Sequence, residues 1–172
     1  MTDDTKELDE LRLKIDQLDQ KIQTLISERV TVAGDIAKAK VAEGSTVFYR
    51  PEREAQVLRR IRERNEGPLS DGQIARLMRE IMSASLAAEM PLTVAYLGPE
   101  GTYTQAAELK HFGHAVTPRA VNTIAAVFES VGRGDSHYGV VPVENSSEGV
   151  VSSTLDLFLE SELSVCGEVQ VR

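Results

Sequence analysis

LDELRLKIDQLDQKIQTLISERVTVAGDIAKAKV, residues 8–41, is the stretch that decides the fold of this 172-residue chain. Its apolar residues recur at alternating steps of three and four, as on one face of a heptad-patterned helix: Leu8, Leu11, Ile15, Leu18, Ile22, Leu25, Val32, Ile36 and Ala39. Such a helix is about 50 Å long, whereas a compact domain has a radius of gyration near ~13 Å. One short domain cannot cover this stripe, so we expect a second chain to pack on it.

Two further helices are expected before residue 90. Pro51 suits the first residue of a helix. Ser70 and Gln73 have the spacing of a capping box, which opens a third helix. The apolar face of that third helix consists of Ile74, Leu77, Met78, Ile81 and Met82. We therefore expect an all-α domain of three helices over residues 1–90, followed by a second domain over residues 91–172.

The second domain has a different pattern. Short apolar strands alternate with helices, which is typical of parallel βαβ units. The expected order is a strand at 93–97, a helix from near Thr104, a strand at 115–117, a helix at 123–131 capped by Asn122, a strand at 138–143, a helix at 154–159 and a strand at 163–169. These elements predict an α/β lobe.

The composition narrows the possible partners. The formal net charge of −8 argues against nucleic acid, because such binding rests on Lys and Arg neutralising phosphates. No apolar run reaches the ~20 residues that span a bilayer, and the amino terminus lacks the pattern of a secretory signal. Cys166 is the only cysteine, which excludes an intrachain disulfide and a cysteine metal cluster. We expect a cytoplasmic protein.

Two cations on the first helix are candidates for binding an anion. Arg29 occupies the heptad position after Leu25, where the stripe favours an apolar residue. Lys40 follows eleven residues later, a rotation of about 20° and a rise of ~16 Å. Two cations on one face could hold both ends of a small dianion. The simpler interpretation is that both are solvated surface residues.

Several short motifs resemble the helical chorismate mutases, and the resemblance spans nearly all of residues 7–90. The motifs are Leu11-Arg12, Ile15-Asp16, Leu18-Asp19, Glu28-Arg29, Ala37-Lys38-Ala39-Lys40, Tyr49-Arg50-Pro51-Glu52-Arg53-Glu54 and Ser85. The resemblance implies an intertwined homodimer that converts chorismate to prephenate by a concerted 3,3-rearrangement. That reaction uses no nucleophile, metal or cofactor. It needs the substrate held in its folded, reactive conformation, with a cation where negative charge develops.

The resemblance also implies a role for each site residue. Arg12 and Arg29 would bind the substrate carboxylates, with support from Arg53. Lys40 and Glu89 would donate to the ether oxygen, and Glu54 would accept from the ring hydroxyl. Ser85 would add a hydrogen bond, and Arg50 would act mainly through its backbone amide. Arg12 lies ~25 Å along the helix from Arg29, so the partner chain would supply it. Glu89 must be protonated to donate. The alternative for Glu89 is a frayed helix end in solvent.

A second resemblance covers the rest of the chain. Residues 94–104 and 139–149, VAYLGPEGTYT and GVVPVENSSEG, resemble the prephenate dehydratases, whose substrate lies between two α/β lobes similar to periplasmic binding proteins. The residues of this dehydratase-like cleft would be Thr102, Glu144, Asn145 and Ser146. The family's Thr-Arg-Phe motif, which carries its catalytic threonine, does not occur in the sequence. We therefore expect the front part of a bifunctional mutase–dehydratase, with no dehydratase activity of its own.

Two other functions stay open. One is an isochorismate-pyruvate lyase on the same helical fold. Glu54 argues against it, because such a lyase does not need to recognise a hydroxyl at the ring position that it has in chorismate. The other is a non-catalytic dimerisation module joined to a small-molecule-binding lobe. That module does not explain Arg29 within the apolar stripe, or Arg53 and Glu54 after Pro51.

Overall fold

The computed structural model describes residues 3–44, 49–147 and 149–171. The chain divides into two compact units, Met1–Thr46 and Val47–Arg172. This division differs from the boundary expected at residue 90, which stays a prediction about the domains.

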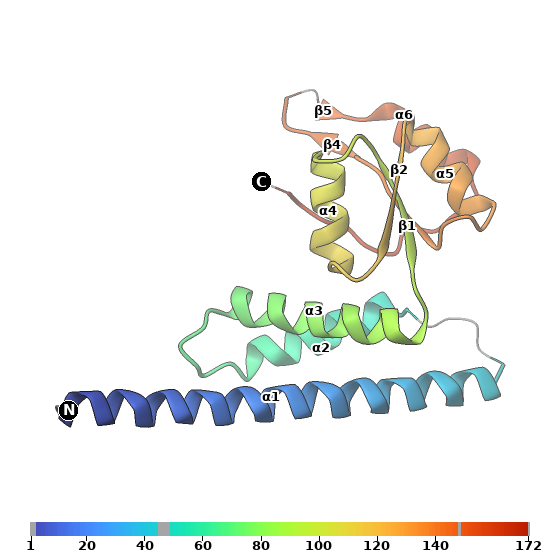
Figure 1. The fold of residues 1–172 in the computed structure, drawn as a ribbon. Helices are drawn as coiled ribbons and strands as arrows, with labels where there is room; N and C mark the ends of the chain where they lie inside the picture. The colour runs from blue at the N-terminus through green and yellow to red at the C-terminus, as the bar shows by residue number, and fades with distance from the viewer. Residues whose placement is uncertain (1–2, 45–48, 148, 172) are drawn as a thin grey trace. The chain divides into compact units, whose positions relative to one another are not determined.

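The first unit is one long helix, α1 (Asp3–Ala42), coloured blue in Figure 1. It runs through Gly34 without a break and ends before Gly44, whose φ of 77° lies in the left-handed region that favours glycine. The apolar stripe predicted from the sequence is exposed on this chain, from 47% for Leu8 to 63% for Leu25. The helix predicted at residues 8–41 is therefore confirmed, and its apolar face is open to solvent.

Two shorter helices begin the second unit, α2 (Pro51–Glu63) and α3 (Asp71–Glu89). The capping box is present: the Gln73 amide donates to Ser70 Oγ (3.3 Å) and the Ser70 amide donates to Gln73 Oε1 (2.9 Å). The two helices pack through a cluster of apolar side chains: Val57, Leu58, Ile61, Ile74, Ala75, Met78 and Met82. Both predicted helices are confirmed.

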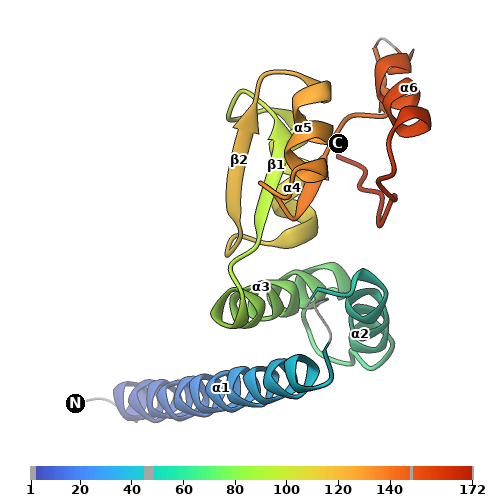
Figure 2. The ribbon, with the colours of Figure 1, turned by 90° about the vertical axis from the view of Figure 1, so that its right-hand side faces the viewer.

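A parallel sheet of three strands follows, with β1 (Thr93–Leu97) between β2 (Thr117–Val121) and β3 (Tyr138–Val140). The helices α4 (Tyr103–Phe112) and α5 (Ile124–Gly132) lie on opposite sides of this sheet (Figures 1 and 2). Gly139 lets α5 pack closely on β3, since a Cβ there would meet Val127 Cγ1 at 2.6 Å. The prediction of parallel βαβ units is confirmed.

Some predicted boundaries in this region are wrong. The second strand starts at Thr117, whose amide donates to Leu92 O (2.7 Å) and opens the ladder with β1. Thr123 caps α5 in place of Asn122, because Thr123 Oγ1 accepts from the Ala126 amide (3.1 Å). The third strand stops at Val140, two residues before a proline that cannot donate to a ladder.

The last predicted strand, 163–169, is also wrong. Residues 161–171 form no strand, because nothing in the described part of the chain pairs with their backbone as a ladder. Before this segment come a short antiparallel ribbon, β4 (Glu144–Asn145) with β5 (Gly149–Val150), and a helix, α6 (Ser152–Glu160). The helix α6 contacts α5 through Phe158 and Phe128, whose ring centroids lie 5.0 Å apart.

The α2–α3 helices and the sheet share a hydrophobic core. Tyr49, which precedes α2, packs with Phe112 of α4 and Tyr138 of β3, with ring centroids 5.6 and 5.2 Å from its own. Leu92 and Val94 complete the buried part of this cluster. The two regions that the sequence separates at residue 90 are therefore packed together within the second unit.

Candidate functional site

On α1 the predicted cations differ in their surroundings. Arg29 and Lys40 are partly buried, and Lys40 lies in the last turn, where the helix dipole favours a positive charge. Arg29 also lines a shallow hollow with neighbouring side chains of α1: Leu25, Glu28, Val32, Ala33 and Ile36. Arg12 is exposed and pairs with Asp9 through Nη1 and Oδ1 at 3.3 Å. Because α1 is continuous, the expected separation of about 25 Å between Arg12 and Arg29 holds along its axis.

The second unit contains a partly buried ion pair at Glu54. Arg79 Nε of α3 donates to Glu54 Oε1 in the first turn of α2 at 3.3 Å, and the side chains are 23% and 17% exposed. Burial raises the pKa of Glu54, although Arg79 and a hydrogen bond from Tyr49 oppose that rise. The Tyr49 hydroxyl in turn lies 3.3 Å from His111 Nε2. The carboxylate predicted to accept from a substrate hydroxyl is thus held directly by Arg79 and Tyr49, and Tyr49 in turn contacts His111.

The remaining predicted mutase residues of this unit lie on α2 and α3. Ser85 is buried, and its hydroxyl donates to Ile81 O at 2.6 Å. Glu89 is partly buried in the last turn of α3. Arg50 is the N-cap residue of α2, where its carbonyl accepts from the amides of Arg53 (3.0 Å) and Glu54 (3.1 Å). Arg50 and Arg53 have exposed side chains.

The predicted dehydratase-like residues lie after the carboxyl ends of two neighbouring strands. Thr102 follows β1 and caps α4; its hydroxyl donates to Leu97 O (3.2 Å) and accepts from the Gln105 amide (3.4 Å). Glu144, Asn145 and Ser146 follow β3 and are exposed. Because β1 and β3 pair in parallel, both groups lie at the same end of the sheet (Figure 1). Open α/β sheets bind ligands at this end.

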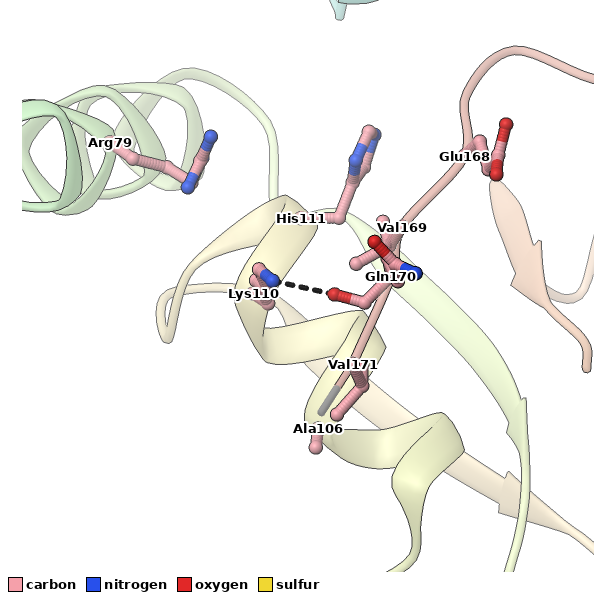
Figure 3. Close-up of a pocket in the computed structure, with 8 residues that line it drawn as sticks. All are labelled: Arg79, Ala106, Lys110, His111, Glu168, Val169, Gln170 and Val171. Atoms are coloured by element: carbon pink, nitrogen blue, oxygen red, sulfur yellow. Dashed lines mark hydrogen bonds between the residues drawn. The ribbon is translucent and has the colours of Figure 1, made fainter. Parts of the chain in front are cut away.

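A hollow of about 700 Å³ lies elsewhere in the second unit, and Figure 3 shows the side chains around it. They come from α3, α4 and the carboxyl-terminal segment: Arg79, Ala106, Lys110, His111, Glu168, Val169, Gln170 and Val171. Lys110 Nζ donates to Gln170 O at 2.6 Å, which ties that segment to α4. None of the predicted site residues is among those eight, so the hollow is not the predicted site.

Sequence patterns did not identify two residues with unusual surroundings. Arg79 stands beside Met78 at the border of the apolar face of α3, and that position was the available signal. Glu108 on α4 is 0% exposed, and neither carboxylate oxygen has a hydrogen-bond partner among the described residues. Burial raises the pKa of Glu108 to about 7. No pattern in the sequence marks Glu108 as buried.

Within residues 3–44, 49–147 and 149–171, no helix combines the length and apolar character needed to cross a membrane. The same part of the chain has no group of three or more His, Cys, Asp or Glu side chains placed to bind a metal ion.

Comparisons with known proteins match two successive parts of the chain to two families. Residues 11–90 match the Chorismate mutase type II family, and residues 94–172 match the Prephenate dehydratase family. A bifunctional chorismate mutase/prephenate dehydratase of Pseudomonas aeruginosa is 56% identical over 98% of this chain and 47% of its own length. A bifunctional chorismate mutase/prephenate dehydratase of Aquifex aeolicus is 39% identical over 96% of this chain and 47% of its own length. The chain therefore spans about half the length of these curated relatives.

Among solved structures, a chorismate mutase (form II) from Thermus thermophilus aligns with a TM-score of 0.46 and 32% identity. The alignment covers 48% of this chain and 93% of that one.

Proposed function

Because residues 11–90 match the chorismate mutase type II family and residues 94–172 match the prephenate dehydratase family, we propose that this chain converts chorismate to prephenate. One observation carries the proposal: the eight positions to which the family's roles transfer all lie within the matched residues 11–90. The bifunctional relatives have the same order of regions in their names. Phenylalanine biosynthesis is the pathway that the two activities together suggest.

The proposed catalytic action is to bind and orient the substrate. Arg12 and Arg29 neutralise its two carboxylates, and this holds the extended molecule in its folded conformation. Lys40 places a positive charge where the breaking ether bond leaves negative charge on oxygen. Glu89, when protonated, donates to the same oxygen. No proton has to leave the substrate, and no covalent intermediate forms.

The other proposed contacts select chorismate. Glu54 accepts from the ring hydroxyl, and its pairing with Arg79 supports this role because the carboxylate stays a hydrogen-bond acceptor while partly buried. Ser85 adds a hydrogen bond, Arg53 supports a carboxylate, and Arg50 contributes its backbone amide. These three assignments rest on the family resemblance alone.

We further propose that the protein is an intertwined homodimer in which the partner chain supplies Arg12. The exposed stripe of α1 supports this, since at least eight large apolar side chains along it are each close to half exposed. Burying such side chains stabilises an association by ~25 cal/mol per Å² of apolar surface. A long apolar stripe on a helix is the feature that a second copy of the same helix can cover.

Light scattering tests the dimer with two matched variants. Ile22→Glu places a charge on the stripe, whereas Lys21→Glu places one beside it on the same turn. We expect the Lys21→Glu protein to have the mass of a dimer and the Ile22→Glu protein to dissociate and lose activity. A monomeric unmodified protein would refute the proposed dimer.

The activity is tested by following the loss of chorismate absorbance with the purified protein and identifying the product. Prephenate supports the proposal. Salicylate with pyruvate from isochorismate would indicate a lyase, and no turnover of either substrate would indicate a non-catalytic dimerisation module.

For residues 94–172 we propose one lobe of a fold similar to periplasmic binding proteins. Thr102, Glu144, Asn145 and Ser146 would contact prephenate from one side, which is supported by their location at one end of the sheet. We expect weak binding at most from these residues alone. A cytoplasmic location also stays a prediction, supported by the single cysteine of the sequence, Cys166.

A further inference from the structure

The ion pair between Arg79 and Glu54 joins two helices across 25 positions of the sequence. Its side chains are 23% and 17% exposed, whereas the pairs Lys38–Asp35 and Arg133–Glu129 lie on the surface. A surface ion pair contributes little to stability, but a partly buried one fixes the geometry of its carboxylate. The Arg79–Glu54 pair is thus placed to set the position of Glu54.

The geometry leaves an acceptor on Glu54 for another donor. Arg79 Nε is bound to Oε1, and together with the Tyr49 hydroxyl it uses two of the about four lone-pair sites of the carboxylate, so acceptor capacity remains. The planar guanidinium restricts where Oε1 can lie, in a way that a flexible ammonium group does not. The Tyr49 hydroxyl also bonds the carboxylate, and it lies 3.3 Å from His111 Nε2. Glu54 therefore has a defined orientation before any substrate binds.

We propose that Arg79 is a positioning residue, which holds the Glu54 carboxylate as the acceptor for the ring hydroxyl of chorismate. This inference rests on the proposed mutase function. Arg79 itself does not touch the substrate in this proposal. It acts through Glu54, and its contribution is therefore specific to a substrate that carries the hydroxyl.

The charges around Glu54 give the proposal a second consequence. Burial raises the pKa of Glu54, and the neighbouring Arg79 guanidinium lowers it. Tyr49 faces the carboxylate as a hydrogen-bond donor, and burial and Arg79 lower the pKa of His111. Glu80, adjacent to Arg79 on α3, is itself bound to His114. Without Arg79, Glu54 would lose its proton only at higher pH.

The test compares Arg79→Met with Arg76→Met, a control at an exposed arginine one turn earlier on α3. Both variants are made in a Glu89→Gln background, so that the titration of Glu89 does not contribute to the pH profile. For Arg79→Met we expect kcat/KM for chorismate to fall about tenfold, mainly through a higher KM, because the Glu54 carboxylate is no longer held in the orientation that accepts from the ring hydroxyl. The acidic limb of its profile should move to higher pH. Arg76→Met should change neither quantity.

A substrate analogue separates positioning from a purely structural role. The chorismate analogue that lacks the ring hydroxyl gives Glu54 nothing to bind, so Arg79→Met and Arg76→Met should turn it over equally. Arg79→Met should also add little to Glu54→Gln, because both changes remove the same interaction. Equal losses on chorismate and on the analogue would mean that Arg79 only supports the fold, and would overturn the inference.

Two further outcomes complete the test. If the unmodified protein has no mutase activity, both the proposed function and this inference are overturned. If the protein is active, and Arg79→Met changes neither the acidic limb of the pH profile nor the preference for chorismate over the analogue without the hydroxyl, the inference alone is overturned. If circular dichroism shows that Arg79→Met is unfolded, Arg79→Lys decides. It should raise KM for chorismate about threefold and leave the analogue unaffected, because an ammonium group does not fix the carboxylate. Unchanged kinetics in Arg79→Lys would contradict the proposal.

Discussion

Gly113 approaches Ser83 so closely that a Cβ atom on residue 113 would lie 2.7 Å from the Ser83 Cβ. Gly113 ends α4 with a φ of 78°, and the Ala115 amide just beyond it donates to Ser83 Oγ at 3.3 Å. Beside this contact, Glu80 accepts from the His114 amide (3.2 Å) and its Oε1 lies 2.9 Å from the His114 ring Nδ1. The turn after α4 is therefore docked directly on α3.

Gly113→Ala should lower the free energy of unfolding by on the order of 3 kcal/mol, since it adds left-handed strain and a clash with Ser83. Gly134→Ala is the matched control, because Gly134 has a φ of 77° and, apart from its chain neighbours, none of the described residues has an atom within 4 Å of the position that a Cβ would take. The control should lose only ~1–2 kcal/mol. Urea unfolding measures both. Equal losses would show that the contact with Ser83 is unimportant.

Glu108 should make stability depend on pH. Its pKa is raised by burial to about 7 in the folded protein, from an ordinary value of 4.5. A carboxyl group with a higher pKa in the folded state opposes folding once it must ionise, so unfolding free energy should fall as pH rises from 4.5 to 7. Glu108→Gln should then be more stable near pH 8 by on the order of 3 kcal/mol.

Near pH 4.5 the same Glu108→Gln variant should show only a small gain, because the carboxyl is protonated in the folded protein and only about half ionised in the unfolded chain. Glu160→Gln, at the exposed end of α6, is the control and should show no such pH dependence. Urea titrations at both pH values provide the measurement. A gain that is equal at the two pH values would rule out the ionisation of Glu108 as its cause.

If Glu89 donates to the ether oxygen as proposed, chorismate should be converted faster in mildly acidic buffer than near neutrality, because only the protonated carboxyl can donate. Glu89→Gln supplies a permanent donor, so its rate should be nearly level over the same range. Initial rates with saturating chorismate measure kcat directly. A rate that stays level or rises with pH in the unmodified protein would remove Glu89 from this role.

Arg12→Ala and Arg29→Ala should each nearly abolish activity, since in the proposed site each change removes a counter-ion from a substrate carboxylate. If each pocket uses Arg12 of one chain and Arg29 of the other, refolding the two variants together restores one intact pocket per mixed dimer. Half the dimers of an equal mixture are mixed, so roughly a quarter of the original activity should return. No recovery in proven mixed dimers would place both arginines in one chain's site.

The 172 residues alone should not form phenylpyruvate from prephenate. Glu144, Asn145 and Ser146 are exposed, and dehydration needs an acid held within hydrogen-bond reach of the leaving hydroxyl in a site that excludes water. Incubation with prephenate at neutral pH, against a blank without protein, measures the product. Phenylpyruvate formation that depends on the protein would show that the Thr-Arg-Phe motif is dispensable.

Local patterns were sufficient for most of the fold. The proline at residue 51 and the capping box at Ser70 placed the starts of α2 and α3, because caps act within one turn. Strand ends were predicted less well. Thr117 begins β2 because its amide donates to Leu92 O. Residues 163–169 form no strand because no strand of the described residues pairs with them, so both outcomes depend on distant backbone.

The sequence by itself determined the order of the elements from α1 to β3, the apolar stripe of α1 and the positions of the candidate cations, since each follows from a period of about 3.6 or 2 along the chain. Only the tertiary structure decided that Glu54 pairs with Arg79, that Glu108 is buried with no hydrogen-bond partner among the described residues, and that Gly113 meets Ser83. These are contacts between segments far apart in the sequence, or burial beneath them. Their energies depend on the exclusion of water, which the periodic pattern of apolar residues along the sequence does not reveal.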